Sequence, residues 1–239
     1  MKKITDIPYS PIHNSCKLDL YLPETECFKT FVYFHGGGLE AGDKAGEAEE
    51  IMGTAFAQNG VAFLSVNYRM YPEAKYPDFI EDAAAAVRWA KEMIPNYGKS
   101  VELYVGGSSA GGYIAMMLCF DPSYGMSELG ICGFVFDAGQ PTVHFNVLRE
   151  SGFDTRRIVV DERAPLYYIG GIVAYPKLLL FVAENDILCR YEQTQLFCAA
   201  FAHFGMKEKI ELHVMQGYGH CGYTGNAEFQ KIVLQFMDV

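Results

Sequence analysis

The chain has 239 residues, half of them hydrophobic, and a formal net charge of −10 at pH 7. This length is typical of one large domain, and the apolar share is sufficient for a substantial buried core. The acidic balance and the lack of a basic run argue against nucleic acid as a partner.

The cysteines and the N-terminus bear on the compartment. The seven cysteines are scattered, odd in number and without a C-x-x-C pair, so we interpret them as small hydrophobic side chains. No apolar segment follows Lys2 and Lys3 as it would in a secretory signal, and no apolar run is long enough to span a bilayer. We therefore expect a cytoplasmic protein that does not associate with membranes.

Strand-like and helix-like segments alternate along the whole chain. The expected strands are residues 16–22, 28–34, 61–68, 101–105, 131–136, 178–183 and 210–214. The expected helices are residues 78–93, 110–118, 193–204 and 228–237. This alternation predicts an α/β fold with a mostly parallel central sheet flanked by helices, formed by a single domain over residues 1–239. Active sites in such sheets lie beyond the carboxyl ends of the strands.

A serine pattern stands at one of these strand ends. Residues 107–111 read G-S-S-A-G and join the expected strand 101–105 to the expected helix 110–118. G-x-S-x-G at a strand-to-helix turn is the nucleophile elbow, which exposes a serine hydroxyl at the top of a sheet. Ser109, its middle residue, is therefore the candidate nucleophile.

A serine nucleophile needs a base within hydrogen-bond reach and a carboxylate that orients the base. His220 follows the last expected strand and is the candidate base. Asp186 follows the buried strand 178–183, and we favour it as the acid because the two preceding loop residues let its side chain turn back over the sheet edge. Glu184 is the alternative. The histidines interpreted as structural are His13, His144, His203 and His213.

Main-chain N–H groups can stabilise the oxyanion of a tetrahedral intermediate. Ala110 offers one such group from the elbow. A second source is expected in the H-G-G-G segment at 35–38, which follows the expected strand 28–34. Glycine at these positions lets the backbone approach the oxyanion without an obstructing Cβ.

With these motifs the chain resembles the α/β-hydrolase superfamily, and within it the hormone-sensitive-lipase-like esterases and the small acetyl esterases. The resemblance runs from residue 18 to His220. It rests on H-G-G-G at 35–38, N-Y-R-M-Y-P-E at 67–73 and G-S-S-A-G-G at 107–112.

The resemblance implies an α/β-hydrolase fold and specific roles for named residues. It places Ser109, Asp186 and His220 in the catalytic triad. The same resemblance assigns the oxyanion hole to the N–H groups of Gly37, Gly38 and Ala110, and it implies that Arg69 and Asp82 brace the elbow. The room for a lid lies in the insertion of about 138–175, which we expect to form a minimal cap; the alternative is an ordinary long loop with a helix.

The expected activity is that of a serine carboxylester hydrolase for short acyl esters, including acetyl groups on carbohydrate, acting through an acyl-enzyme. Two alternatives stay open: an amide hydrolase such as a kynurenine formamidase-like enzyme or a small peptidase, and a non-catalytic binding protein on the same fold. The expected partner is a small-molecule ester. We expect no metal and no organic cofactor, because the histidines lack the spacing of a metal site. The sequence leaves the oligomeric state open.

Overall fold

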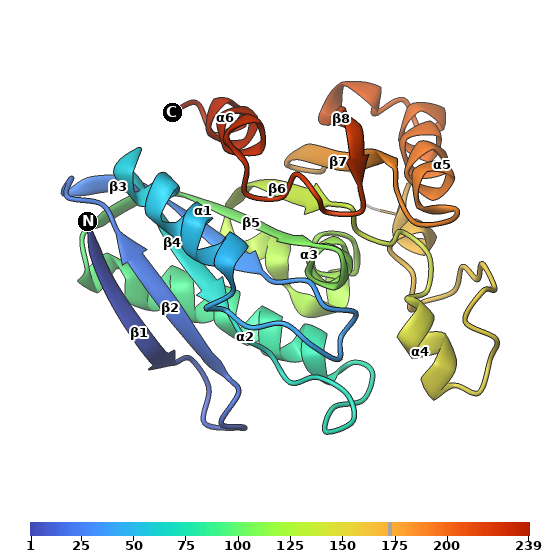
Figure 1. Cartoon of the computed structure of the whole chain (residues 1–239), viewed down its shortest axis with the longest axis horizontal. Coiled ribbons are helices and arrows are strands. Elements are labelled where there is room, and N and C mark those ends of the chain that lie inside the picture. Colours follow the sequence, from blue (N-terminus) through green and yellow to red (C-terminus); the bar gives the residue numbers. More distant parts are fainter. Residues whose placement is uncertain (172–173) are drawn as a thin grey trace.

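The computed structural model describes residues 1–171 and 174–239 and contains a sheet of eight strands (Figure 1). The spatial order of the strands is β1-β2-β4-β3-β5-β6-β7-β8. The first four strands are β1 (Lys2–Pro8), β2 (Lys17–Leu22), β3 (Cys27–Phe34) and β4 (Val61–Val66). The others are β5 (Lys99–Ser108), β6 (Ile131–Asp137), β7 (Lys177–Asn185) and β8 (Ile210–Gly219).

The sheet is mostly parallel, as the sequence predicts. From β4 through β8 every neighbouring pair of strands is parallel, whereas β2 runs antiparallel to β4 and β1 antiparallel to β2. The edge strand β1 was not expected, because its sequence K-K-I-T-D-I-P is largely polar and most of it remains exposed. An edge strand can lie on the rest of the sheet without a strongly apolar face.

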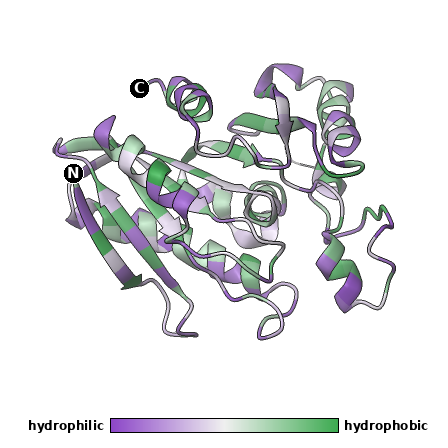
Figure 2. Ribbon diagram, in the orientation of Figure 1, coloured by the Kyte–Doolittle hydropathy of each residue, from purple (hydrophilic) through white to green (hydrophobic). Residues whose placement is uncertain are grey.

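Helices cover both faces of the sheet. They are α1 (Glu47–Gln58), α2 (Asp78–Met93), α3 (Ala110–Phe120), α4 (Phe145–Glu150), α5 (Arg190–His203) and α6 (Ala227–Phe236). One core contains the buried side chains of α1 and α6, and the other contains those of α2, α3 and α5. Along β3 the side chains of Phe31 and Tyr33 join the first core, while those of Val32 and Phe34 join the second. Figure 2 shows hydrophobic residues along the central strands.

Helix α1 is absent from the sequence expectations. Its segment contains Gly53, which weakens the helical pattern because glycine is a poor helix former. The structure explains the glycine: a Cβ at Gly53 would lie 2.7 Å from the ring of Tyr21, so only glycine lets the helix pack this closely on β2. The close packing on Tyr21 therefore accounts for the glycine that made this helix difficult to predict from the sequence.

The segment between β6 and β7 contains α4 and a short 3-10 helix at Pro165–Tyr168. Figure 1 shows α4 at the end of the molecule where the parallel strands finish. Whether this segment works as a cap stays a prediction. Within the described residues, no helix is both long and apolar enough to cross a membrane.

Candidate active site

The elbow holds Ser109 in a backbone conformation that few residues other than glycine adopt. Ser109 has φ 52° and ψ −109°, between the end of β5 and the start of α3. Its N–H donates to the main-chain oxygen of Asp137 at 2.7 Å. A Cβ at Gly111 would lie 2.0 Å from the main-chain oxygen of Phe34, so the first turn of α3 packs directly on the end of β3. These contacts hold the serine in place, as the strained turn requires.

A line of hydrogen bonds joins the three residues predicted as a triad. Nε2 of His220 lies 2.8 Å from Oγ of Ser109, and Nδ1 of His220 lies 2.6 Å from Oδ1 of Asp186. The serine follows β5, the aspartate follows β7 and the histidine follows β8. Three strand ends that are distant in sequence thus meet at one edge of the sheet.

The environment of Asp186 favours its ionised form. Burial acts to raise the pKa of this carboxyl, but hydrogen bonding to His220 and to the N–H groups of Ala183 and Ile187 outweighs it, and the pKa is lowered. The side chain is fully buried, whereas that of His220 is 22 % exposed. A carboxylate in this setting can hold the imidazole in one tautomer and stabilise its cation.

The structure places Glu184 away from His220. Glu184 is exposed, and its carboxylate accepts the N–H of Gly217 at 2.8 Å. This contact joins the end of β7 to β8. Of the two carboxylates weighed from the sequence, Asp186 is the one that the structure brings to the histidine.

The histidines other than His220 have partners of their own. Two of them, His35 and His144, are buried, and each ring contacts its own local segment. The hydrogen-bond, ion-pair or ring partners are Glu73 for His13, Gly36 for His35, Asn146 for His144, Phe204 for His203 and Glu211 for His213.

The glycine loop after β3 lies against the serine. An added Cβ at Gly36 would be 3.3 Å from Cβ of Ser109. Gly37 has φ 111° and Gly38 has φ 67°, and these backbone conformations favour glycine. Within residues 1–171 and 174–239, the N–H groups of Gly37, Gly38 and Ala110 donate no hydrogen bond to the protein. They are therefore free to bind an oxygen of a ligand.

Helix α4 holds this glycine loop from outside. The side-chain amide of Asn146 donates to the main-chain oxygen of Gly38 and, at 2.9 Å, to the carboxylate of Glu40. Arg149, one turn further along α4, forms an ion pair with Glu40. Neither residue is predicted from the sequence, because nothing in the local pattern links residues 146–149 to the glycine motif.

A buried carboxylate that is not predicted from the sequence lies next to the elbow. Asp137 ends β6, is fully buried, and accepts a hydrogen bond from the hydroxyl of Thr224 at 2.5 Å. Its other carboxylate oxygen has no partner among the described residues. Burial raises the pKa of Asp137 to about 6, although Thr224, Tyr223 and His220 act to lower it. The available signal was an acidic residue that ends an otherwise apolar strand beside the elbow.

Arg69 and Asp82 form a two-pronged ion pair with both distances at 2.8 Å. The pair joins the segment after β4 to helix α2, and Asp82 also accepts the N–H of Arg69. These hydrogen bonds give Arg69 and Asp82 a structural role, because they connect the segment after β4 to helix α2. That they brace the elbow stays a prediction.

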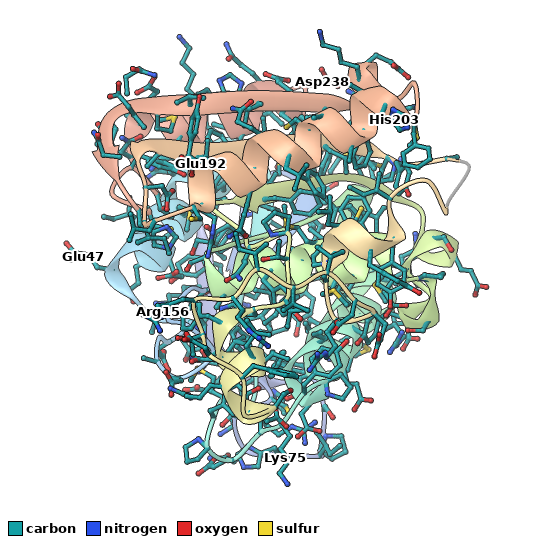
Figure 3. All side chains as sticks on the ribbon, turned by 90° about the vertical axis from the view of Figure 1, so that its right-hand side faces the viewer. Glu47, Lys75, Arg156, Glu192, His203 and Asp238 are labelled. Atoms are coloured by element: carbon teal, nitrogen blue, oxygen red, sulfur yellow. The ribbon has the colours of Figure 1, made fainter. Side chains whose placement is uncertain are left out.

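A cavity of about 840 Å³ opens beside His220. Its walls come from the segment 155–158, from residues 185–190 at the start of α5, and from Phe145 of α4. Figure 3 looks onto this side of the molecule, with Arg156 and Glu192 labelled on the two elements that flank it. In the part of the chain that the structure describes, no group of three or more His, Cys, Asp or Glu side chains is arranged to hold a metal ion.

An α/β-hydrolase fold is defined by three features of this chain: the order of the strands, the elbow at Ser109, and the loop after β8 that carries His220. A profile of the BD-FAE family matches residues 18–147, more than half of the chain. The chain therefore belongs to the BD-FAE family. The matched region contains the glycine loop and Ser109, and it ends before Asp186 and His220.

Curated relatives carry names of ester-cleaving and related enzymes. Esterase LipI of Mycobacterium tuberculosis is 31% identical over 136 residues, which are 49% of this chain and 42% of the relative. Tuliposide A-converting enzyme b1 of Tulipa gesneriana is 24% identical over 229 residues, 84% of this chain and 61% of the relative. Lipase 2 of a Moraxella species is 39% identical over 88 residues, 36% of this chain and 20% of the relative. The chain thus spans less than two thirds of the length of each.

Solved structures share the fold over the full length of this chain. A truncated carbohydrate esterase from gut microbiota has a TM-score of 0.83 at 19% identity and covers 100% of this chain and 95% of its own. Esterase B of Lactobacillus rhamnosis, inhibited by a tributyrin phosphonate, has a TM-score of 0.81 at 19% identity, covering 99% and 85%. Identities this low establish the shared fold.

Proposed function

We propose that this chain is a serine carboxylester hydrolase that works through an acyl-enzyme on Ser109. The observation that carries the proposal is the hydrogen-bonded line from Oγ of Ser109 through His220 to Asp186. Membership of the BD-FAE family and the esterase names of the relatives support the same reaction class. The free N–H groups beside the serine supply what an acyl-transfer site also needs.

The geometry supports a two-step reaction. Oγ of Ser109 attacks the ester carbonyl carbon while Nε2 of His220 takes the hydroxyl proton. The carbonyl oxygen becomes an oxyanion, which the N–H groups of Gly37, Gly38 and Ala110 bind. As the carbon–oxygen bond to the alcohol breaks, His220 gives its proton to the leaving oxygen.

Water then completes the cycle. His220 takes a proton from a water molecule, whose oxygen attacks the acyl carbon. As the bond between the acyl carbon and Oγ of Ser109 breaks, His220 gives that proton to Oγ, which releases the carboxylic acid and a free Ser109. Asp186 stays ionised throughout and stabilises the imidazolium of His220 in both steps. The net reaction consumes one ester and one water and forms one acid and one alcohol.

The proposed substrates are short acyl esters, including acetyl groups on carbohydrate. Phe145 stands beside the glycine loop, its ring 3.4 Å from where a Cβ on Gly38 would lie, and it also forms part of the wall of the cavity beside His220. We place it at the boundary between the acyl side and the alcohol side, where it restricts the space next to the acyl carbon. The name of the carbohydrate esterase with the same fold agrees with a sugar-linked acetyl group. We further propose that the protein acts without a metal or organic cofactor in the cytoplasm.

Replacing the nucleophile tests this proposal. Ser109→Ala should reduce hydrolysis of p-nitrophenyl acetate by about a millionfold in kcat while the fold is retained, since a triad without its nucleophile keeps only residual catalysis. Ser108→Ala is the neighbouring control and should lose far less. N-formylkynurenine is assayed in parallel. Cleavage of the amide in preference to the ester, or more than a few per cent of activity left in Ser109→Ala, would contradict the proposal.

A further inference from the structure

The cavity beside His220 lies on the side where the alcohol part of an ester must leave. In the proposed reaction, His220 gives its proton to the alcohol oxygen, so the alcohol has to lie against the imidazole. The cavity wall contains His220 and extends from it toward residues 155–158 and 187–190. At about 840 Å³ the cavity can hold an alcohol much larger than methanol or ethanol.

The charges around this cavity differ from those of the protein as a whole. The chain carries a net charge of −10 and has seven arginines, yet three of the seven, Arg156, Arg157 and Arg190, line this cavity. The acidic residue in the wall is Asp186, whose buried carboxylate is engaged by His220. The wall therefore offers positive charge that its own carboxylate does not balance.

The three arginines differ in how they are engaged. Arg156 is paired with Asp154, two residues earlier. Arg190 is buried and donates to the main-chain oxygen of Ala138 and to the side chain of Gln140, both of them uncharged acceptors. Arg157 forms no ion pair with the described residues, and its guanidinium lies 5.7 Å from the ring centre of Phe153. Among the described residues, Arg157 is thus a cation at the cavity with no carboxylate in ion-pair contact, although its charge acts on the nearby Asp154.

Neutral groups in the wall complete a site for an anion with an apolar body. The side-chain oxygen of Gln193 accepts the hydroxyl of Thr142, which leaves its amide N–H groups free to donate into the cavity. Ile158 and Leu188 line the same cavity and are 55 % and 96 % exposed. Guanidinium groups bind carboxylates in a planar two-pronged geometry, and exposed apolar side chains favour contact with an apolar ligand.

We propose that the cavity selects esters whose alcohol carries a carboxylate, with Arg157 as the principal contact and Arg156 and Arg190 as supporting charges. This proposal rests on the proposed function, because it assigns the alcohol side of that reaction. The acyl group is attached at Ser109, and the carboxylate of the alcohol points away from it toward residues 156–157. Arg157 is then a residue that determines specificity rather than one that takes part in the chemistry.

Three acetates of matched shape test the proposal: 4-acetoxybenzoate, its neutral methyl ester, and the cationic 4-acetoxy-N,N,N-trimethylanilinium. The measurement is the ratio of kcat/KM for the anionic to the neutral acetate in wild type and in variants. Because each variant is compared with wild type on the same substrates, the intrinsic reactivities of the leaving groups cancel. Arg157→Gln should lower this ratio about three- to fivefold at low ionic strength, and 0.5 M NaCl should remove most of the difference. The ratio of kcat/KM for the cationic to the neutral acetate should rise in the same variant.

Matched variants isolate the charge at this position. Arg157→Lys should keep most of the preference for the anion, and Asp154→Asn, which releases Arg156 from its pair, should increase it. Arg88→Gln, an exposed arginine of α2 bonded to the main-chain oxygen of Tyr124, should leave the ratio unchanged. Because Arg157 is exposed, the variant is expected to fold.

The outcomes separate this proposal from the one on which it rests. Hydrolysis of the neutral acetate that depends on Ser109, together with an unchanged ratio in Arg157→Gln, overturns the anion proposal and leaves the esterase proposal standing. Hydrolysis of none of the three acetates by the wild type overturns both.

Discussion

The side-chain amide of Asn146 donates a hydrogen bond to the main-chain oxygen of Gly38, which lies 108 residues earlier in the chain. The same amide contacts Glu40, and Asn146 itself is buried. Through this contact the insertion between β6 and β7 holds the glycine loop that lies against Ser109. The insertion is therefore hydrogen-bonded to the loop that we propose as part of the oxyanion hole.

Asn146→Ala should lower kcat on p-nitrophenyl acetate about tenfold with a smaller change in KM. The reason is that small displacements of preorganised oxyanion donors weaken stabilisation of the transition state more than binding of the substrate. The free energy of unfolding should fall by about 1–3 kcal/mol, because Gly38 and Glu40 lose a donor. Asn59→Ala, which removes an exposed amide bonded to the end of α1, is the matched control. A loss of stability with unchanged kcat would show that Asn146 is structural only.

Asp186→Asn should reduce kcat about 10⁴-fold, whereas Glu184→Gln should change it little. An amide at position 186 favours the wrong tautomer of His220 and cannot stabilise its cation. Glu184 in contrast accepts an N–H from Gly217 at the surface. Steady-state kinetics of the two purified variants decide the matter. Equal losses, or a larger loss in Glu184→Gln, would transfer the role of the acid to Glu184.

Asp137→Asn should stabilise the protein at pH 8 more than at pH 4. Burial raises the pKa of Asp137 from 3.8 to about 6. The folded state therefore holds this proton more tightly than the unfolded state does. The associated stability is fully present below pH 4 and is lost as the pH rises through about 6, a change of roughly 3 kcal/mol. The asparagine variant does not undergo this loss.

Urea unfolding of Asp137→Asn and wild type between pH 4 and pH 8 measures the difference. Glu208→Gln removes an exposed carboxylate between α5 and β8 and serves as the control. A stability difference between Asp137→Asn and wild type that does not change with pH would show that Asp137 titrates alike in the folded and unfolded states.

Short acyl chains should give the highest kcat/KM in a series of p-nitrophenyl esters from acetate to palmitate, with a steep fall beyond about four to six carbons. Each buried CH₂ contributes roughly 0.8 kcal/mol only where an apolar surface receives it, and Phe145 occupies the space beside Gly38. Phe145→Ala should shift the preferred acyl chain to longer lengths by opening this space. A wild-type maximum at eight carbons or more would mean that the insertion receives long acyl chains.

The class of fold and much of the site follow from local patterns in the sequence. Alternating strand and helix segments predict a mostly parallel sheet, and G-x-S-x-G and H-G-G-G each encode a backbone shape that few other sequences adopt. Each of these two motifs spans only a few residues, because tight turns and close backbone approaches restrict residue type locally. Ser109 is predicted from the sequence because it is the centre of G-x-S-x-G, and His220 because it follows the last expected strand.

Contacts between distant segments depend on tertiary structure, because they arise only when separate strand ends and helices meet. The sequence favours Asp186 as the acid with Glu184, two residues earlier, as the alternative, and the direction of the loop after β7 brings Asp186 and not Glu184 to His220. Helix α1 was not predicted because Gly53 is a poor helix former. Glycine stands there because the helix packs closely on the ring of Tyr21. The burial of Asp137 likewise depends on β3, β5 and the loop after β8 packing around it. The sequence near residue 137 does not predict that packing.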